Sequence, residues 1–184
     1  VALHDIRKRL KDIGLKEEYI LSSSKNYKFN TDKPYYLDYE DFFINYKEAT
    51  KLFNNKLYSK AKDNFTIAKK IYGNGLLPSN IYDDWAIPKI NHAEKTYLQI
   101  LSKLYLIEKD ISNEKAKSIL EEYLNIDPYS YEMNTEYIKL LLKQREVKKA
   151  MDYYNYIKEL FASELGEEFT SKEVSNFIKE IQFS

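Results

Sequence analysis

An alanine recurs at a matching place in three segments, and this register constrains how the chain folds. Ala116 and Ala150 lie 34 residues apart, within KAKSILEEYLNID and KAMDYYNYIKELF, which align around them. The earlier segment KAKDNFTIAKKIY aligns on Ala61, with Phe65 and Ala68 four and seven residues later. Where two helices cross closely, a side chain larger than alanine would hold them apart. The register therefore predicts paired helices with a small residue early in each second helix.

The spacing of these alanines is similar to that of the tetratricopeptide repeat, whose period is 34 residues. Pro128 follows Ala116 by twelve residues, where that repeat commonly turns into its next unit. Ala61 and Ala116 are 55 residues apart, about 21 more than one period. We expect the extra residues within YGNGLLPSNIYDDWAIPKI. The alternative is an ordinary helical bundle with coincidental alanines, but the agreement of three segments favours the repeat.

Most of the chain after position 37 has the hydrophobic spacing of helices. Only four glycines and four prolines occur in 184 residues, which favours long elements with few sharp turns. Gly73 and Gly166 follow predicted helices, and Pro88 suits a first helical turn. We therefore predict a mainly α fold, with helices at 39–54, 56–72, 86–110, 113–125, 129–143, 147–163 and 171–181.

The N-terminal stretch has a different pattern. Four apolar residues at helical spacing precede a glycine that suits a left-handed cap: Leu3, Ile6, Leu10, Ile13 and Gly14. Two short β-like runs follow at 19–21 and 27–29, separated by a polar turn, and a third at 35–37 comes after Pro34. The sequence thus predicts two domains, 1–37 and 38–184.

Charge and hydropathy restrict the location and the partners of the chain. Residues 1–30 hold seven lysines and arginines against four acidic residues, whereas the whole chain has a net charge of zero. This asymmetry is too small to indicate nucleic-acid binding by itself. No apolar run approaches the ~18–20 residues needed to cross a bilayer, and the charged first residues do not resemble a signal peptide. We expect a cytoplasmic protein with no membrane partner.

No catalytic motif is found in the sequence. The absence of cysteine excludes a disulfide framework and a thiol nucleophile. His4 and His92 are the only histidines, and they are not at metal-ligand spacing. Acidic residues alternate with lysines, as Glu114 and Lys117 do, in the manner of a solvated helix surface. We therefore expect no enzyme activity, no metal and no cofactor, although folding could still bring two distant carboxylates together.

Aromatic residues are abundant, with 18 tyrosines and nine phenylalanines. At helical spacing, such rings usually pack in the core and between repeats. We favour this interpretation over a stacking surface for bases.

The order of these features resembles a bacterial transcriptional activator domain that follows a winged helix-turn-helix, as in the Streptomyces antibiotic regulatory protein family and related response regulators. LHDIRKRLKDIG is similar to the second half of that family's recognition helix. YILSSSKNYKFN resembles its wing hairpin, and YYLDYEDF resembles its crossing strand. The most specific match is KKAMDYYNYIKELFASELGEEFTSKEVSNFIKEI, which is similar to the family's last repeat helix, link and final amphipathic helix. The resemblance covers essentially the whole chain.

The resemblance implies a DNA-binding transcription regulator, whose recognition helix enters the major groove and whose wing reaches the backbone or the minor groove. The residues implied in contact with double-stranded DNA are His4, Arg7, Lys8 and Lys25. The alternative is that these side chains only solvate a helix face. Asp5 stands where the family usually has arginine. The helical domain would bind RNA polymerase, another protein or a second copy of itself.

A second hypothesis comes from a different functional class. In it, the chain is a tetratricopeptide scaffold or peptide-sensing module that does not bind DNA. Upstream sequence that carries the first strands and helices of a winged domain would favour the regulator. A gene product that begins near Val1 would favour the scaffold.

Overall fold

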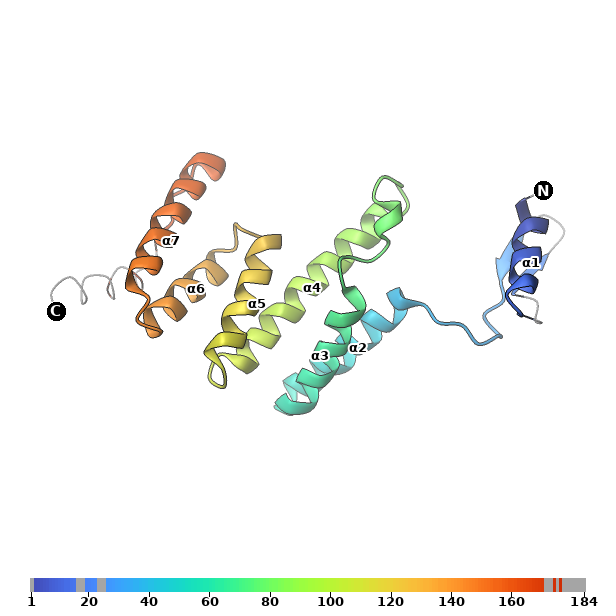
Figure 1. The fold of residues 1–184 in the computed structure, drawn as a ribbon, viewed down its shortest axis with the longest axis horizontal. Helices are drawn as coiled ribbons and strands as arrows, with labels where there is room; N and C mark the ends of the chain where they lie inside the picture. Colours follow the sequence, from blue (N-terminus) through green and yellow to red (C-terminus); the bar gives the residue numbers. More distant parts are fainter. Residues whose placement is uncertain (1, 16–18, 23–25, 171–173, 175, 177–184) are drawn as a thin grey trace. The chain divides into compact units, whose positions relative to one another are not determined.

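The computed structural model describes the whole chain except residues 1, 16–18, 23–25, 171–173, 175 and 177–184. The described part is mainly helical, with seven α-helices and one two-stranded hairpin (Figure 1). The chain divides into two compact units, Val1–Leu37 and Asp38–Ser184.

The N-terminal unit consists of one helix and one hairpin. Helix α1 (Ala2–Asp12) ends before Gly14, whose φ of 87° turns the chain so that the N–H of Leu15 donates to the carbonyl of Leu10 at 3.0 Å. Strands β1 (Ile20–Ser22) and β2 (Tyr27–Phe29) are antiparallel, with Leu21 opposite Lys28. The helix and the hairpin lie where the sequence predicts them.

The third predicted strand, at 35–37, is wrong, because these residues are not in a strand. The chain turns directly after β2. The N–H of Asn30 still donates to the carbonyl of Tyr19 at 2.8 Å, but its side-chain oxygen accepts from the N–H of Asp32 at 3.2 Å. Pro34 then has no N–H to contribute to a sheet. The turn and the proline together end the sheet at two strands.

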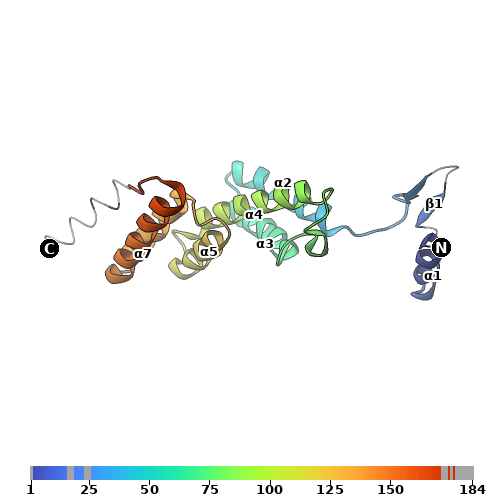
Figure 2. The same cartoon turned by 90° about the horizontal axis from the view of Figure 1, so that it is seen from above.

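The second unit consists of three helical pairs in chain order. Helix α2 (Asp38–Asn54) packs on α3 (Tyr58–Tyr72), α4 (Ile87–Glu108) on α5 (Asn113–Ile126), and α6 (Tyr131–Lys143) on α7 (Val147–Leu160). Each pair also contacts the next, through α3 with α4 and α5 with α6 (Figure 2). Six predicted helices are thus confirmed within a few residues at their ends. The seventh, 171–181, falls almost entirely outside the described residues.

The three aligned alanines occupy equivalent places in the second helix of each pair. Each is the fourth residue of its helix: Ala61 in α3, Ala116 in α5 and Ala150 in α7. All three are buried, with at most 1% of their surface exposed. The extra residues between Ala61 and Ala116 form a connection at 73–86, with a short 3₁₀ turn at Pro78–Asn80, and lengthen the following helix. Helix α4 has 22 residues, whereas α6 has 13.

The core of this unit has two parts. The larger cluster runs from α2 to α6 and includes Phe42, Phe65, Ile100 and Leu120. The smaller one joins α6 and α7 to the segment that follows them, and its buried members include Ile138, Ile157, Phe161, Phe169 and Val174. Tyr137 on α6 packs against both clusters.

Enlarging an aligned alanine tests the close packing of the pairs. We expect Ala116→Leu to lower the free energy of unfolding by about 2 kcal/mol, because a fully buried site between packed helices has no room for the added carbons. Urea denaturation followed by circular dichroism measures the change. The exposed Ala162 provides the control, since Ala162→Leu should change stability by less than about 0.5 kcal/mol. Equal effects at both positions would contradict close packing at Ala116.

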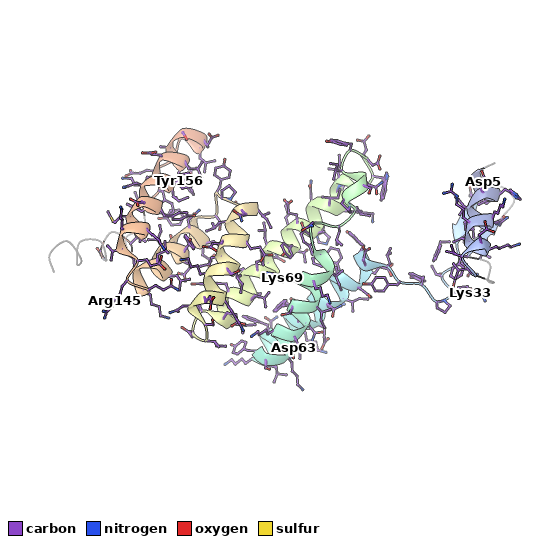
Figure 3. All side chains as sticks on the ribbon, in the orientation of Figure 1. Asp5, Lys33, Asp63, Lys69, Arg145 and Tyr156 are labelled. Atoms are coloured by element: carbon purple, nitrogen blue, oxygen red, sulfur yellow. The ribbon has the colours of Figure 1, made fainter. Side chains whose placement is uncertain are left out.

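The turns within the first and third pairs share one strained conformation. Lys56 and Arg145 each have a φ of 61°, and each lies five residues before an aligned alanine. Arg145 is labelled in Figure 3. Their N–H groups donate to the carbonyls of Phe53 and Leu142, both at 2.9 Å. This left-handed cap favours glycine, because a Cβ atom is disfavoured there.

Glycine at these two turns should therefore stabilise the protein. We expect Lys56→Gly and Arg145→Gly each to raise the free energy of unfolding by about 1 kcal/mol. Thermal unfolding of each variant checks this, with Lys95→Gly, at an exposed position inside α4, as the control that should lose about 1 kcal/mol. If either glycine variant were less stable, the contacts of the long side chain at that turn would contribute more to stability than the left-handed backbone conformation costs.

Candidate functional site

Helix α1 carries three of the four residues that the sequence predicts for DNA contact, and two of them lie on its exposed polar face. His4 and Lys8 are exposed and lie four residues apart, so they share one face of the helix. Arg9 and Lys11 are also exposed. Asp5, labelled in Figure 3, is exposed as well, and its spacing places its carboxylate beside Lys8 and Arg9. Asp12 is exposed on the same side, four residues after Lys8, so this face carries three lysine or arginine side chains against two acidic ones.

Arg7 occupies a different environment from its neighbours on α1. Its side chain is partly buried, and Nη2 donates to the carbonyl of Ile20 and to Oγ of Ser22, both at 2.7 Å. Arg7 therefore connects α1 to β1. These bonds hold its guanidinium within the unit, and contact between Arg7 and DNA stays a prediction.

The hairpin contributes less to the predicted site. Lys25 lies outside the described residues. Tyr27 and Lys28 on β2 are both exposed. The structure thus brings His4 and Lys8 together on α1.

The N-terminal unit also has a hollow that sequence reasoning missed. Its volume is about 430 Å³, and its lining is apolar, from Leu10 and Ile6 on α1 to Phe29 and Tyr35 beyond it. The side chains of Ile6, Phe29 and Tyr35 are 46%, 49% and 44% exposed. A unit of this size leaves much of its apolar surface in contact with water.

A groove on the helical unit is lined mainly by the first helix of each pair, with polar and apolar side chains in similar shares. Its volume is about 710 Å³, and α2, α4 and α6 contribute most of its residues. Across it, the hydroxyl of Tyr46 donates to Oε1 of Gln99 at 2.5 Å. Lys103 extends over the ring of Phe53, with Nζ 4.5 Å from the centroid, and Lys95 is exposed. The groove offers two lysines, one carboxylate from Glu132, amides and hydroxyls to a ligand.

Two acidic groups of the helical unit, one buried and one partly exposed, link neighbouring helices. Glu108 on α4 is 2% exposed and forms an ion pair with Lys62 on α3. Glu122 on α5 pairs with Lys69 on α3 and also accepts a hydrogen bond from the hydroxyl of Tyr97 on α4. Burial, followed by this hydrogen bond, raises the pKa of Tyr97 well above its ordinary value. These contacts connect α3, α4 and α5, so both carboxylates are engaged in holding the helices together.

Neither histidine of the described chain lies in a metal-binding group. His92 stacks on Phe43, with ring centroids 4.7 Å apart and planes 9° apart. Among the described residues, no cluster of three or more histidines and acids could hold an ion. Within the same residues, no helix has the length and hydrophobicity needed to cross a membrane.

Comparison with known proteins identified no relative of the chain. No family model matches the chain, and no curated protein matches it. The surfaces described above are therefore the basis for assigning a function.

Proposed function

We propose that the protein is a cytoplasmic DNA-binding transcription regulator. The observation that carries the proposal is the exposed basic face of α1, followed directly by an antiparallel hairpin and then by paired helices. In this proposal, α1 and the hairpin are the recognition helix and wing of a winged helix-turn-helix domain. The apolar hollow of the N-terminal unit supports it, because the remaining elements of such a domain would cover an apolar face.

The proposed DNA contacts divide by their chemistry. Lys8 would attract backbone phosphates, which gives affinity without sequence choice. His4 lies one turn earlier on the same face and would approach a base edge. Arg7 would act mainly by holding α1 on the hairpin, through its two bonds to β1. Asp5 would repel phosphate, or accept from the amino group of a cytosine.

The helical unit would serve as a tetratricopeptide-like interaction module. The equivalent burial of Ala61, Ala116 and Ala150 supports this arrangement, and so does the packing of the helices in successive pairs. The groove lined by α2, α4 and α6 is the surface that we propose for a partner protein, such as RNA polymerase or a second copy of the chain. Its lysines would favour a partner segment with acidic residues.

A salt-dependent titration tests the proposal. We expect the full-length protein to bind duplex DNA with an affinity that falls steeply as salt increases. Lys8→Ala should reduce the slope of log K against log salt by about 1, and fluorescence anisotropy measures it. Lys115→Ala, on an exposed part of α5, should leave the slope unchanged. No affinity for any duplex at low salt would overturn the proposal.

A scaffold that does not bind DNA is the second candidate. The observation that favours it is that the groove belongs wholly to the helical unit, so it requires nothing from α1. The same titration separates the two, because a scaffold would bind a peptide in the groove and would show no salt-dependent affinity for DNA.

A further inference from the structure

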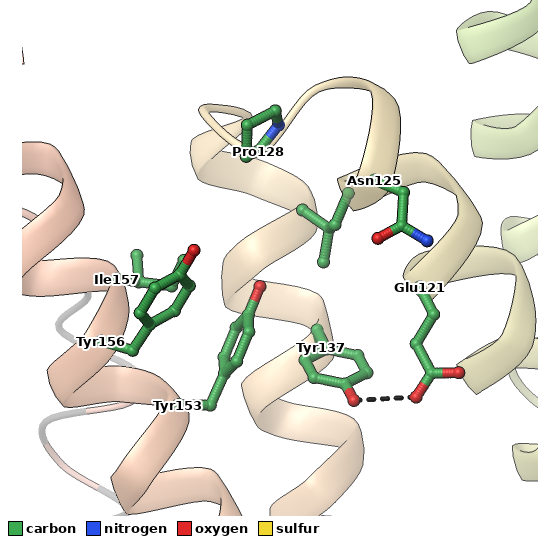
Figure 4. A pocket seen from close by; sticks show the side chains of 8 residues that line it. Glu121, Asn125, Pro128, Tyr137, Tyr153, Tyr156 and Ile157 are labelled. Atoms are coloured by element: carbon green, nitrogen blue, oxygen red, sulfur yellow. Dashed lines mark hydrogen bonds between the residues drawn. The ribbon is translucent and has the colours of Figure 1, made fainter. Parts of the chain in front are cut away.

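A second hollow in the helical unit lies apart from the groove. It is formed by α5, α6 and α7, and its volume is about 180 Å³ (Figure 4). Glu121, Tyr137, Tyr153 and Tyr156 line it, with Pro128 at one edge. Pockets that enclose a whole drug-sized molecule usually measure 300–1,000 Å³. The size of this pocket therefore suits one chemical group.

Three tyrosine rings form one wall of the pocket. The rings of Tyr137 and Tyr153 have centroids 4.8 Å apart and planes at 69°, and those of Tyr153 and Tyr156 are 6.0 Å apart at 47°. The hydroxyl of Tyr153 donates to Oδ1 of Asn134 at 2.6 Å, which fixes the central ring. Tyr156 is 55% exposed, so the pocket is accessible from solvent on its side. The three rings are therefore inclined to one another, and the hydrogen bond to Asn134 holds the ring of Tyr153 in place.

The pocket carries a negative charge. Oε1 of Glu121 accepts a hydrogen bond from the hydroxyl of Tyr137 at 2.9 Å (Figure 4). Burial and this hydrogen bond raise the pKa of Tyr137, so its hydroxyl stays protonated at neutral pH. Among the residues that the structure describes, no lysine or arginine lines the pocket. The nearby cations Lys117 and Lys149 both pair with Glu146 instead.

We propose that this pocket binds a quaternary ammonium group. The face of an aromatic ring carries negative potential and attracts a cation within about 6 Å of its centroid. Methylation removes the N–H donors of an ammonium, so the cation needs apolar and aromatic neighbours with a nearby negative charge. The three tyrosines and Glu121 provide both. The group can belong to a free small cation of the choline type or to a trimethylated lysine of a partner protein.

Calorimetric titration of the chain tests the proposal with defined probes. The probes are choline, its uncharged analogue 3,3-dimethylbutan-1-ol, and a short peptide with a central lysine that is either trimethylated or unmodified. We expect choline or the trimethylated peptide to bind at least about tenfold more tightly than its uncharged or unmodified counterpart. Binding of choline alone identifies a free cation as the source, and binding of the peptide alone identifies a protein.

Variants of the lining residues separate cation binding from general hydrophobic contact. Tyr156→Phe keeps the ring and should bind within about twofold of the original chain, whereas Tyr156→Ala should bind about fivefold more weakly. Glu121→Gln should also lose about fivefold, because it removes the charge. Glu114→Gln removes the same charge from an exposed position elsewhere on α5 and should bind within about twofold.

Three results would overturn the proposal. One is that neither choline nor the trimethylated peptide binds at tens of millimolar. Another is that the uncharged analogue binds as tightly as choline. The third is equal binding by Tyr156→Ala and Tyr156→Phe, with circular dichroism showing both folded. None of these results depends on DNA, so they leave the proposed regulatory function untouched.

Discussion

Replacing Asn134 with leucine should lower the free energy of unfolding by about 3 kcal/mol. Asn134 is 0% exposed and lies at the start of α6. Its Nδ2 donates to the carbonyls of Pro128 and Ser130 at 2.8 and 2.9 Å, and its Oδ1 accepts from the hydroxyl of Tyr153. Leucine fills the space but leaves the carbonyl of Pro128 and the hydroxyl of Tyr153 without a partner. Chemical denaturation measures the loss.

A double variant identifies the cause of this loss. Adding Tyr153→Phe to Asn134→Leu removes the orphaned hydroxyl and should recover about 1 kcal/mol. Asn155 on α7 is exposed, so Asn155→Leu should change stability by less than about 0.5 kcal/mol. If the double variant were less stable than Asn134→Leu alone, the hydrogen bond between α6 and α7 would not explain the effect.

Alkaline pH should destabilise the protein strongly. Burial, followed by hydrogen bonds to Glu122 and Glu136, raises the pKa of Tyr97 and Tyr105 far above 10, and the two side chains are only 3% and 4% exposed. The unfolded chain releases these protons near pH 10, whereas the folded chain retains them. Their contribution to stability is therefore complete below pH 10 and is lost as the pH rises above it. Two such groups correspond to a loss of about 3 kcal/mol between pH 9 and pH 11.

Denaturation curves at several pH values measure this loss. The Tyr97→Phe/Tyr105→Phe variant should be less stable at pH 8, because two carboxylates lose a donor. Its stability should then fall less steeply between pH 9 and pH 11 than that of the original chain. Equal slopes would mean that groups other than these two tyrosines cause the alkaline loss. Tyr58→Phe, at an exposed tyrosine, is the matched control and should keep the full slope.

Local patterns predicted the helices well because the information needed lies within each segment. The spacing of apolar residues and the glycines after helices placed six of them, and the alanine register aligned the second helices. Local pattern could not decide whether residues 35–37 form a strand, because a strand needs a neighbouring strand to pair with. The turn at Asn30 directs these residues away from the hairpin. The sequence also did not show how the extra residues after Tyr72 divide between a loop and α4, since all of them could have formed a loop.

The candidate sites depend on contacts that no local pattern reports. Tyr46 and Gln99 are 53 residues apart and meet only after the helical pairs have stacked. Glu121, Tyr137 and Tyr156 come from three helices, and the general expectation that aromatic rings pack internally does not distinguish the exposed Tyr156 from its neighbours. The basic face of α1 was visible in the sequence, but the engagement of Arg7 with β1 required the docked hairpin.

The division of the core into two clusters has a consequence for cooperativity. The boundary between the clusters runs along α6, whose Met133 and Leu140 belong to the larger cluster and whose Ile138 belongs to the smaller one. Helix α7 can therefore open along this boundary while α2 to α6 stay folded. Amide hydrogen exchange should then be faster in α7 than in α4. The tyrosine pocket spans this boundary, from α5 to α7. A cation bound there would link α7 to α5 and α6 and would slow amide exchange in α7, so binding in the pocket would make α7 more rigid.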